Sequence, residues 1–279
     1  MVGATPDSVA ATVVALGGRR GERSTGDATR GACQECGFPG DDRNSTRSAD
    51  TVARVELLDE YTGHVDPAGP AARRDLDEVS ITKVSVGPMD NNAYVVVDRG
   101  TGEALLIDAA NETERLLDTI DTVADRGKLT ALATTHKHWD HIQSLEDVAR
   151  ATAPRTYAHE RDAPELPVAP DVTVTDDDTV PFGNTHVQVI HLDGHTPGSI
   201  ALLYRDPRGT GHLFTGDSLF PGGPGRTTSP EDFTSLMDDL EGKVFGHLDD
   251  DTWVYPGHGD DTTLGAERPH LPEWRERGW

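Results

Sequence analysis

Thr135-His136-Lys137-His138-Trp139-Asp140-His141 is the stretch that decides the fold and the chemistry of this 279-residue chain. It places three imidazoles and one carboxylate within six residues, directly after the apolar run Leu129–Thr134, which predicts a strand. A helix would not aim these side chains at one point, because residues two apart do not share a helix face. Imidazole and carboxylate are the ligands of zinc sites that keep one position open for water. The stretch therefore predicts a metal site on a loop at the end of a strand.

Three later segments repeat this plan, each with a candidate ligand after a predicted strand. They are Gly194-His195-Thr196-Pro197-Gly198-Ser199, Thr215-Gly216-Asp217 and Gly257-His258-Gly259. Glycine beside each candidate ligand allows the backbone to turn sharply, since glycine has no Cβ. The sequence thus predicts that His195, Asp217 and His258 join the first cluster.

Strands and helices follow one another from Val79 onward. Alternating or continuous apolar runs predict strands at Val79–Val86, Asn92–Val97, Ala104–Ile107, Leu129–Thr134, Val187–Leu192, Ser199–Tyr204, His212–Thr215 and Thr252–Tyr255. Helical spacing predicts helices at Asn111–Arg126, Ile142–Ala151 and Glu231–Leu248. This order predicts a layered α/β protein with helices packed outside the sheets.

Residues 1–78 differ from residues 79–279 and are expected to be a low-complexity, flexible N-terminal extension of the folded domain. The segment Val52–Tyr61 is expected to form a short helix. Cys33 and Cys36 are spaced like half of a zinc site, and a reduced pair in a flexible tail is the other interpretation.

Composition limits the partners of the chain. Hydrophobic residues make up 35% of it, and no run of 18 apolar residues is present, so we expect no membrane span. The first residues lack a basic segment of the kind that begins a secretory signal, so a cytoplasmic location is expected. The net charge of −24 would repel nucleic acid. A small-molecule substrate is the expected partner, and the oligomeric state stays open.

Taken together, His-x-His-x-Asp-His, Gly-His-Thr-Pro-Gly-Ser, Thr-Gly-Asp and Gly-His resemble the metallo-β-lactamase superfamily. Their order and spacing, with the loop Gly216–Thr227, are similar to the glyoxalase II-like (hydroxyacylglutathione hydrolase-like) branch. The resemblance runs from about Val79 to the C-terminus. It implies a four-layer αβ/βα sandwich with metals at one edge.

The resemblance also implies roles for the candidate residues. His136, His138 and His195 would bind one metal, Asp140, His141 and His258 a second, and Asp217 would bridge both. Both ions would be divalent, zinc being expected and iron remaining possible. Asp140 and Asp217 are the residues expected to be catalytic. A hydroxide shared by the metals would attack a carbonyl, as in the hydrolysis of a thioester.

Several alternatives stay open. Glyoxalase II proper carries a helical C-terminal domain that helps to hold glutathione, whereas 21 residues follow His258 here, which puts glutathione in doubt. A lactonase or a β-lactamase would use the same metals. A persulfide dioxygenase would instead hold one iron on His136, His195 and Asp217. Arg226 is a candidate for binding a substrate carboxylate, and Asn91 is interpreted as a turn residue.

Overall fold

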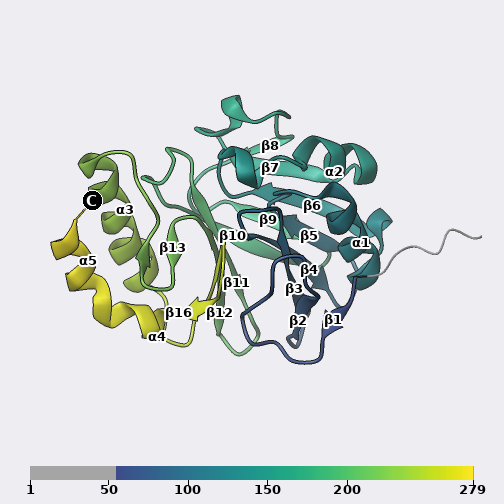
Figure 1. Ribbon diagram of the computed structural model, residues 1–279, viewed down its shortest axis with the longest axis horizontal. Coiled ribbons are helices and arrows are strands. Elements are labelled where there is room, and N and C mark those ends of the chain that lie inside the picture. The colour runs from purple at the N-terminus through teal and green to yellow at the C-terminus, as the bar shows by residue number, and fades with distance from the viewer. Residues whose placement is uncertain (1–54, 279) are drawn as a thin grey trace, which may run out of the picture. The chain divides into compact units, whose positions relative to one another are not determined.

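The computed structural model describes residues 55–278, which belong to the larger of two units of the chain, residues 50–279. Two β-sheets in this unit lie face to face (Figure 1). The first sheet has eight strands, which lie in the order of the chain: β1 (Leu57–Leu58), β2 (Ala71–Asp75), β3 (Val79–Val86), β4 (Asn91–Asp98), β5 (Ala104–Ile107), β6 (Leu129–Thr134), β7 (Arg155–His159) and β8 (Val172–Val174).

The second sheet has six strands, and a small third sheet has two. The six lie in the order β16 (Thr262–Thr263), β15 (Trp253–Pro256), β12 (Gly211–Gly216), β11 (Ile200–Arg205), β10 (Thr185–His191) and β9 (Thr179–Phe182). The two are β13 (Leu219–Phe220) and β14 (Gly223–Pro224).

Helices cover the outer face of each large sheet (Figure 1). The α-helices are α1 (Thr113–Val123), α2 (Leu145–Thr152), α3 (Pro230–Asp239), α4 (Leu264–Glu267) and α5 (Leu271–Arg277). A π-helix spans Leu240–Phe245, and short 3₁₀ turns span Arg126–Lys128, Trp139–His141, Ala163–Glu165 and Arg268–His270. Helices α1 and α2 lie on the first sheet, whereas α3 and α5 lie on the second.

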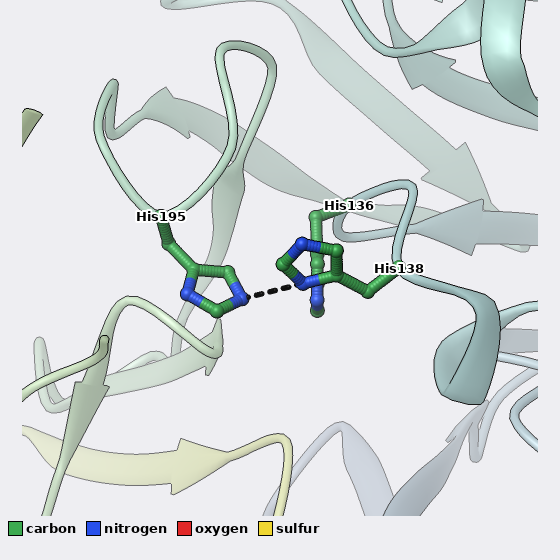
Figure 2. Close-up of side chains that lie close together, drawn as sticks. All are labelled: His136, His138 and His195. Carbon is green, nitrogen blue, oxygen red and sulfur yellow. Dashed lines mark hydrogen bonds between the residues drawn. The ribbon is translucent and has the colours of Figure 1, made fainter. Parts of the chain in front are cut away.

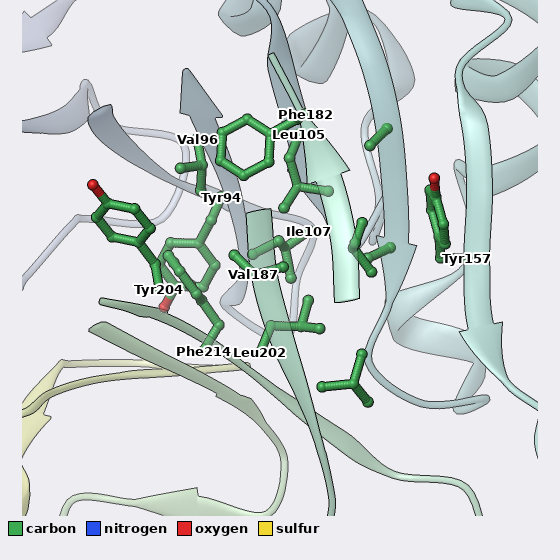
Figure 3. Close-up of a cluster of buried hydrophobic side chains, with 14 of the residues drawn as sticks. Tyr94, Val96, Leu105, Ile107, Tyr157, Phe182, Val187, Leu202, Tyr204 and Phe214 are labelled. Carbon is green, nitrogen blue, oxygen red and sulfur yellow. The ribbon is translucent and has the colours of Figure 1, made fainter. Parts of the chain in front are cut away.

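Three hydrophobic clusters hold these layers together. Side chains alternate along a strand, so Tyr94 and Val96 of β4 face the second sheet while Val95 faces α1. The cluster between the sheets also contains Phe214 of β12 and Leu202 of β11 (Figure 3). Because the middle of the first sheet is buried on both faces, β5 (Ala104–Ile107) is apolar throughout, whereas β3 also buries the polar side chains of Ser80, Thr82 and Lys83. The layers confirm the four-layer αβ/βα sandwich expected from the sequence.

The topology gathers strand ends at one edge of the sandwich. Strand β6 pairs in parallel with β5 and β7, and β12 pairs in parallel with β15. The carboxyl ends of parallel neighbours lie side by side. The loops after β6, β12 and β15 therefore leave the sheets at this edge.

The predicted strands from Val79 onward are confirmed, as are the predicted helices, with small shifts at their ends. The predicted helix Asn111–Arg126 ends earlier, since α1 stops at Val123. The prediction Glu231–Leu248 also changes, because α3 gives way to the π-helix after Asp239.

Upstream of Val79 the structure corrects one prediction. The helix expected over Val52–Tyr61 is wrong in its described part, because Leu57–Leu58 form β1, which pairs in parallel with β2. Residues 55–78 thus add two strands to the first sheet. Cys33 and Cys36 lie outside the described residues. None of the helices that the structure describes has the length and apolar character needed to cross a membrane.

Candidate metal centre

All seven candidate ligands meet at this edge of the sandwich. His136, His138, Asp140 and His141 follow β6, whereas His195 follows β10, Asp217 follows β12 and His258 follows β15. His136, His138 and His195 form the first group, in which one nitrogen from each ring lies within 4.8 Å of the others (Figure 2). Within it, Nδ1 of His138 lies 2.9 Å from Nε2 of His195.

Asp140, His141 and His258 form the second group, whose ligand atoms also lie within 4.8 Å of one another. Nε2 of His141 lies 3.1 Å from Nε2 of His258. Nε2 of His258 lies 3.3 Å from Oδ2 of Asp140.

Asp217 lies between the two groups. Its Oδ2 is 3.5 Å from Nε2 of His195 in the first group and 3.5 Å from Nε2 of His258 in the second. Its Oδ1 is 3.3 Å from Nε2 of His141. This is the position that a bridging carboxylate would occupy.

Hydrogen bonds outside the cluster fix which nitrogen faces inward in three of the rings. Nδ1 of His195 donates to the carbonyl of Arg226 over 2.7 Å, and Nδ1 of His258 donates to the carbonyl of Met89 over 2.9 Å. Nδ1 of His141 lies 3.0 Å from a carboxylate oxygen of Asp108. Since a carbonyl only accepts, Nε2 of His195 and of His258 presents a lone pair to the centre.

The donor set fits cations. Nε2 of His136 and Oδ1 of Asp217 are buried and have no hydrogen-bond partner, which is costly for polar atoms. Nε2 of His258 carries a lone pair, and Nε2 of His141 does too when its Nδ1 donates to Asp108, so a cation between these two atoms would remove their repulsion. Two divalent cations would satisfy these atoms.

The pKa shifts of the first group agree with this donor set. Burial lowers the pKa of His136 well below its usual range, and burial also lowers the pKa of His138 and His195. Neutral imidazole is the form that binds metal.

In the second group burial acts to lower the pKa of His141 and of His258, but the nearby carboxylates outweigh it and raise both, Asp108 and Asp217 at His141 and Asp217 at His258. Burial acts to raise the pKa of Asp217, but the neighbouring imidazoles of His141 and His258 outweigh it and hold that pKa far below its usual range.

Two glycines are required by the close packing here. A Cβ on Gly257 would lie 2.3 Å from Oδ1 of Asp217, and one on Gly216 would lie 2.6 Å from the hydroxyl of Thr135. Gly216 also has φ +49°, a conformation that glycine tolerates best. The glycines next to the candidate ligands therefore allow the loops to approach one another.

Two residues of the site were missed or misinterpreted in the sequence. Asn91 is the first residue of β4, and its amide donates to Oδ2 of Asp140 over 3.0 Å, so its role is larger than the turn predicted for it. Asp108 follows β5 and accepts from Nδ1 of His141. Its place directly after a strand, beside the other strand ends, was the signal available for it.

The surroundings of the cluster combine apolar and cationic groups. Met89 is 48% exposed and Trp139 is 60% exposed, which is unusual for large apolar side chains. Each lies next to candidate ligands, through the Met89 carbonyl and through the chain neighbours of Trp139. A cavity of about 380 Å³ is lined by Arg226 and Arg277, among others, and Arg226 touches His195 through its carbonyl.

A protein-family model described as the metallo-beta-lactamase superfamily matches residues 86–258, more than half of the chain. The chain belongs to the metallo-beta-lactamase superfamily. Members of this superfamily are generally metal-dependent hydrolases, and the matched residues contain all seven candidate ligands. The resemblance drawn from the motifs is thereby confirmed.

Relatives within the superfamily include one with a named activity. An uncharacterized protein of Aquifex aeolicus is 32% identical over 212 residues, which cover 69% of this chain and 95% of that protein. The hydroxyacylglutathione hydrolase of Gloeobacter violaceus is 37% identical over 138 residues. That match covers 49% of this chain and 52% of the hydrolase, so this chain spans about half of that relative.

Solved structures of the same fold carry different names. The BLEG-1 B3 metallo-beta-lactamase is 27% identical with a TM-score of 0.60, covering 69% of this chain and 98% of the other. ETHE1 from Myxococcus xanthus is 29% identical with a TM-score of 0.60, and the match covers 69% of this chain and 83% of ETHE1. TTHA1623 in a di-iron-bound form is 32% identical with a TM-score of 0.55, covering 69% and 99%. These likenesses leave the metal and the substrate open.

Proposed function

We propose that this superfamily member is a dinuclear metal-dependent hydrolase that cleaves a thioester or a related acyl compound. The observation that carries the proposal is the position of Asp217 between two groups of ligand atoms. His136, His138 and His195 would hold one cation, and Asp140, His141 and His258 the other. Zinc is the cation we propose, because its catalytic sites use imidazole and carboxylate ligands.

Two such cations, when bound, polarise the substrate carbonyl and supply hydroxide from water near neutral pH. The chain's own residues would hold these cations and orient the attacking water. Asp217 fixes the spacing of the two groups, and the outer hydrogen bonds of His195 and His258 fix their rings. Asp140, whose Oδ2 is held by Asn91, is the carboxylate that we propose orients the attacking water and takes its proton.

The leaving group is the reason to favour a thioester. A thiol has a pKa near about 8.5, so a thiolate leaves with little protonation. No serine or cysteine nucleophile is needed for this chemistry, and the likeness to hydroxyacylglutathione hydrolases supports it.

The substrate is proposed to carry an anionic group. Arg226 and Arg277 line the cavity beside His195. In a chain of net charge −24, a cavity that offers two arginines favours an anion, since guanidinium pairs with carboxylate in a fixed fork. Met89 and Trp139 would cover an apolar part of the acyl chain.

The test combines metal analysis with hydrolysis. Purified protein is analysed for metals by mass spectrometry and assayed with a series of acyl thioesters, S-D-lactoylglutathione among them. About two zinc ions per chain with turnover of at least one thioester is expected. Two zinc ions with turnover of lactones or β-lactams alone would overturn the thioester part, and a chain that binds no divalent cation would overturn the whole proposal.

An iron enzyme is the second candidate, because the related TTHA1623 is described in a di-iron-bound form. A persulfide dioxygenase would hold one iron on His136, His195 and Asp217 and would need oxygen. One iron per chain and oxygen consumption with a persulfide substrate would favour it. Hydrolysis that proceeds without oxygen would exclude it.

A further inference from the structure

A buried ion pair lies behind the loop that carries His258. Nζ of Lys83 is 2.7 Å from Oδ1 of Asp261, and both side chains are fully shielded from solvent. Lys83 belongs to β3, and Asp261 lies three residues beyond His258. All the residues of this pair and its partners Tyr61 and Gly63 fall outside residues 86–258, which match the superfamily model.

Every donor and acceptor of the pair is used. The ammonium of Lys83 has three protons, and its three acceptors are Asp261, the carbonyl of Gly63 at 2.8 Å and the carbonyl of Gly259 at 2.7 Å. The other oxygen of Asp261 accepts from the hydroxyl of Tyr61 over 2.6 Å and from Nε1 of Trp253 over 3.0 Å. A pair with all partners in place has a defined geometry.

These bonds act on the backbone on either side of His258. Gly259, held by Lys83, is the next residue after His258, and its carbonyl also accepts from the amide of Asn92 over 2.9 Å. On the other side, the carbonyl of Gly257 accepts from the backbone N–H of Asn92 over 2.8 Å. The N-terminal segment adds a further tie, because Asp261 donates its backbone N–H to Gly63.

Stability alone is a weak reason for such a pair. Removing two charges from water is costly, and apolar side chains of similar volume often serve a fold as well or better. What apolar side chains would not supply is a donor to the carbonyls of Gly63 and Gly259. The pair therefore fixes the backbone path of the loop that carries His258.

We propose that Lys83 and Asp261 are positioning residues for His258. With Tyr61 and Gly63 they set the affinity with which the second group of ligands, to which His258 belongs, binds its cation. They touch neither cation group themselves. The inference rests on the dinuclear centre proposed above, and it assigns to the N-terminal segment Tyr61–Gly63 a part in that centre. The first group, His136, His138 and His195, is held by other loops and serves as an internal reference.

The test measures both zinc affinities separately, by titration of the metal-free full-length chain against a chromophoric chelator. The variant Lys83→Met with Asp261→Leu removes both charges together, so that neither is left buried alone. We expect the zinc of the second group to bind about 10- to 100-fold more weakly, which is the usual effect of losing an outer partner of a ligand. The affinity for the zinc of the first group should be unchanged.

A milder variant covers the case in which the double variant does not fold. Tyr61→Phe removes one hydrogen bond to Asp261 and keeps the ion pair. We expect the zinc of the second group to bind at least about threefold more weakly, because part of the effect of losing a hydrogen bond to a charged group is transmitted to the loop of His258.

Asp98→Asn is the matched control. Asp98 is a buried carboxylate at the far end of β4 from Asn91, where it accepts from backbone N–H groups of residues 100 and 101. The Asp98→Asn variant should have a lower free energy of unfolding and unchanged affinities for both zinc ions. An unchanged second affinity in both test variants, equal weakening of both zincs, or a weakened second zinc in the control would each overturn the proposal. A wild-type chain that binds one zinc would overturn the dinuclear centre itself, a result seen before any variant is made.

Discussion

Asp108 and His141 form a carboxylate–imidazole pair at the base of the candidate metal centre, with Oδ2 of Asp108 3.0 Å from Nδ1 of His141. Asp108 is itself held by Thr135, whose backbone N–H and hydroxyl each donate to it over 2.7 Å. The carboxylate therefore has a fixed direction. It places the proton of His141 on Nδ1 and turns Nε2 toward Asp217.

We predict that Asp108→Asn weakens the binding of the second zinc by about 10- to 100-fold, because the amide no longer fixes the ring of His141. Competition with a chromophoric chelator measures this affinity. Thr135→Ser keeps the hydroxyl that holds Asp108 and is expected to bind zinc like the wild type. Equal affinities in Asp108→Asn and the wild type would show that His141 is oriented by other contacts.

The layered fold and the convergence of the candidate ligands could be predicted because both follow from short stretches of sequence, namely the spacing of the motifs and the periodicity of the strands. His136 to His141 lie within one loop, and His195, Asp217 and His258 each follow a strand with glycine beside them. Periodicity then indicated the strands that bring the loops to one edge. Whether these side chains bind metal stays a prediction.

The partners of the ligands could not be predicted, since they depend on contacts between segments far apart in the chain. Asn91 looked like a turn residue, yet it reaches Asp140 across the sheet. Lys83 was predicted only as part of the strand Val79–Val86, and its burial against Asp261 was not predicted. Leu57–Leu58 had a helical context, and pairing with β2 overrode it.

We predict that Lys83→Met alone lowers the free energy of unfolding of the metal-free chain by about 3–5 kcal/mol, because it leaves the carboxylate of Asp261 buried without its partner. Urea unfolding followed by circular dichroism measures the change. Adding Asp261→Leu to this variant should restore part of the loss, since no lone charge is then buried. A loss below about 1 kcal/mol in Lys83→Met would contradict the view of a closed, dry pair.

A second buried group gives a prediction on pH. His212 is buried, its Nε2 has no partner, and its Nδ1 lies 2.9 Å from the hydroxyl of Tyr255. Burial, aided by the charge of Arg74, lowers the pKa of His212 from 6.5 to about 4. Between these values the unfolded chain binds the proton and the folded chain does not, so acid favours unfolding.

We therefore predict that His212→Gln removes part of the acid sensitivity of the fold. The contribution of His212 is fully present above pH 6.5 and is lost as the pH falls toward 4, in total about 3 kcal/mol at about 1.4 kcal/mol per pKa unit. Urea unfolding of the metal-free wild type and the metal-free His212→Gln variant at several pH values measures the difference in their free energies of unfolding. The other histidines are the same in both proteins, so parallel stability curves would show that the pKa of His212 is the same in the folded and the unfolded state.

The cavity beside the candidate centre gives a prediction on substrate choice. Among the residues that the structure describes, no carboxylate pairs with Arg226 or Arg277, whereas nearby Arg275 pairs with Glu241 and Asp238. A substrate anion would find Arg277 free to bind it, and Arg275 already engaged.

We predict that Arg277→Met raises KM for an acyl thioester with a carboxylate by about tenfold or more and leaves kcat nearly unchanged, because it removes a charged hydrogen bond made equally to substrate and transition state. KM for a neutral thioester should not change. Arg275→Gln, on the same helix, is the control and should leave both KM values as they are. Steady-state kinetics with the two substrates measure these effects. Because guanidinium recognises the anion and has no part in bond cleavage, an equal rise for the neutral substrate would mean that Arg277 acts only on the packing of α5.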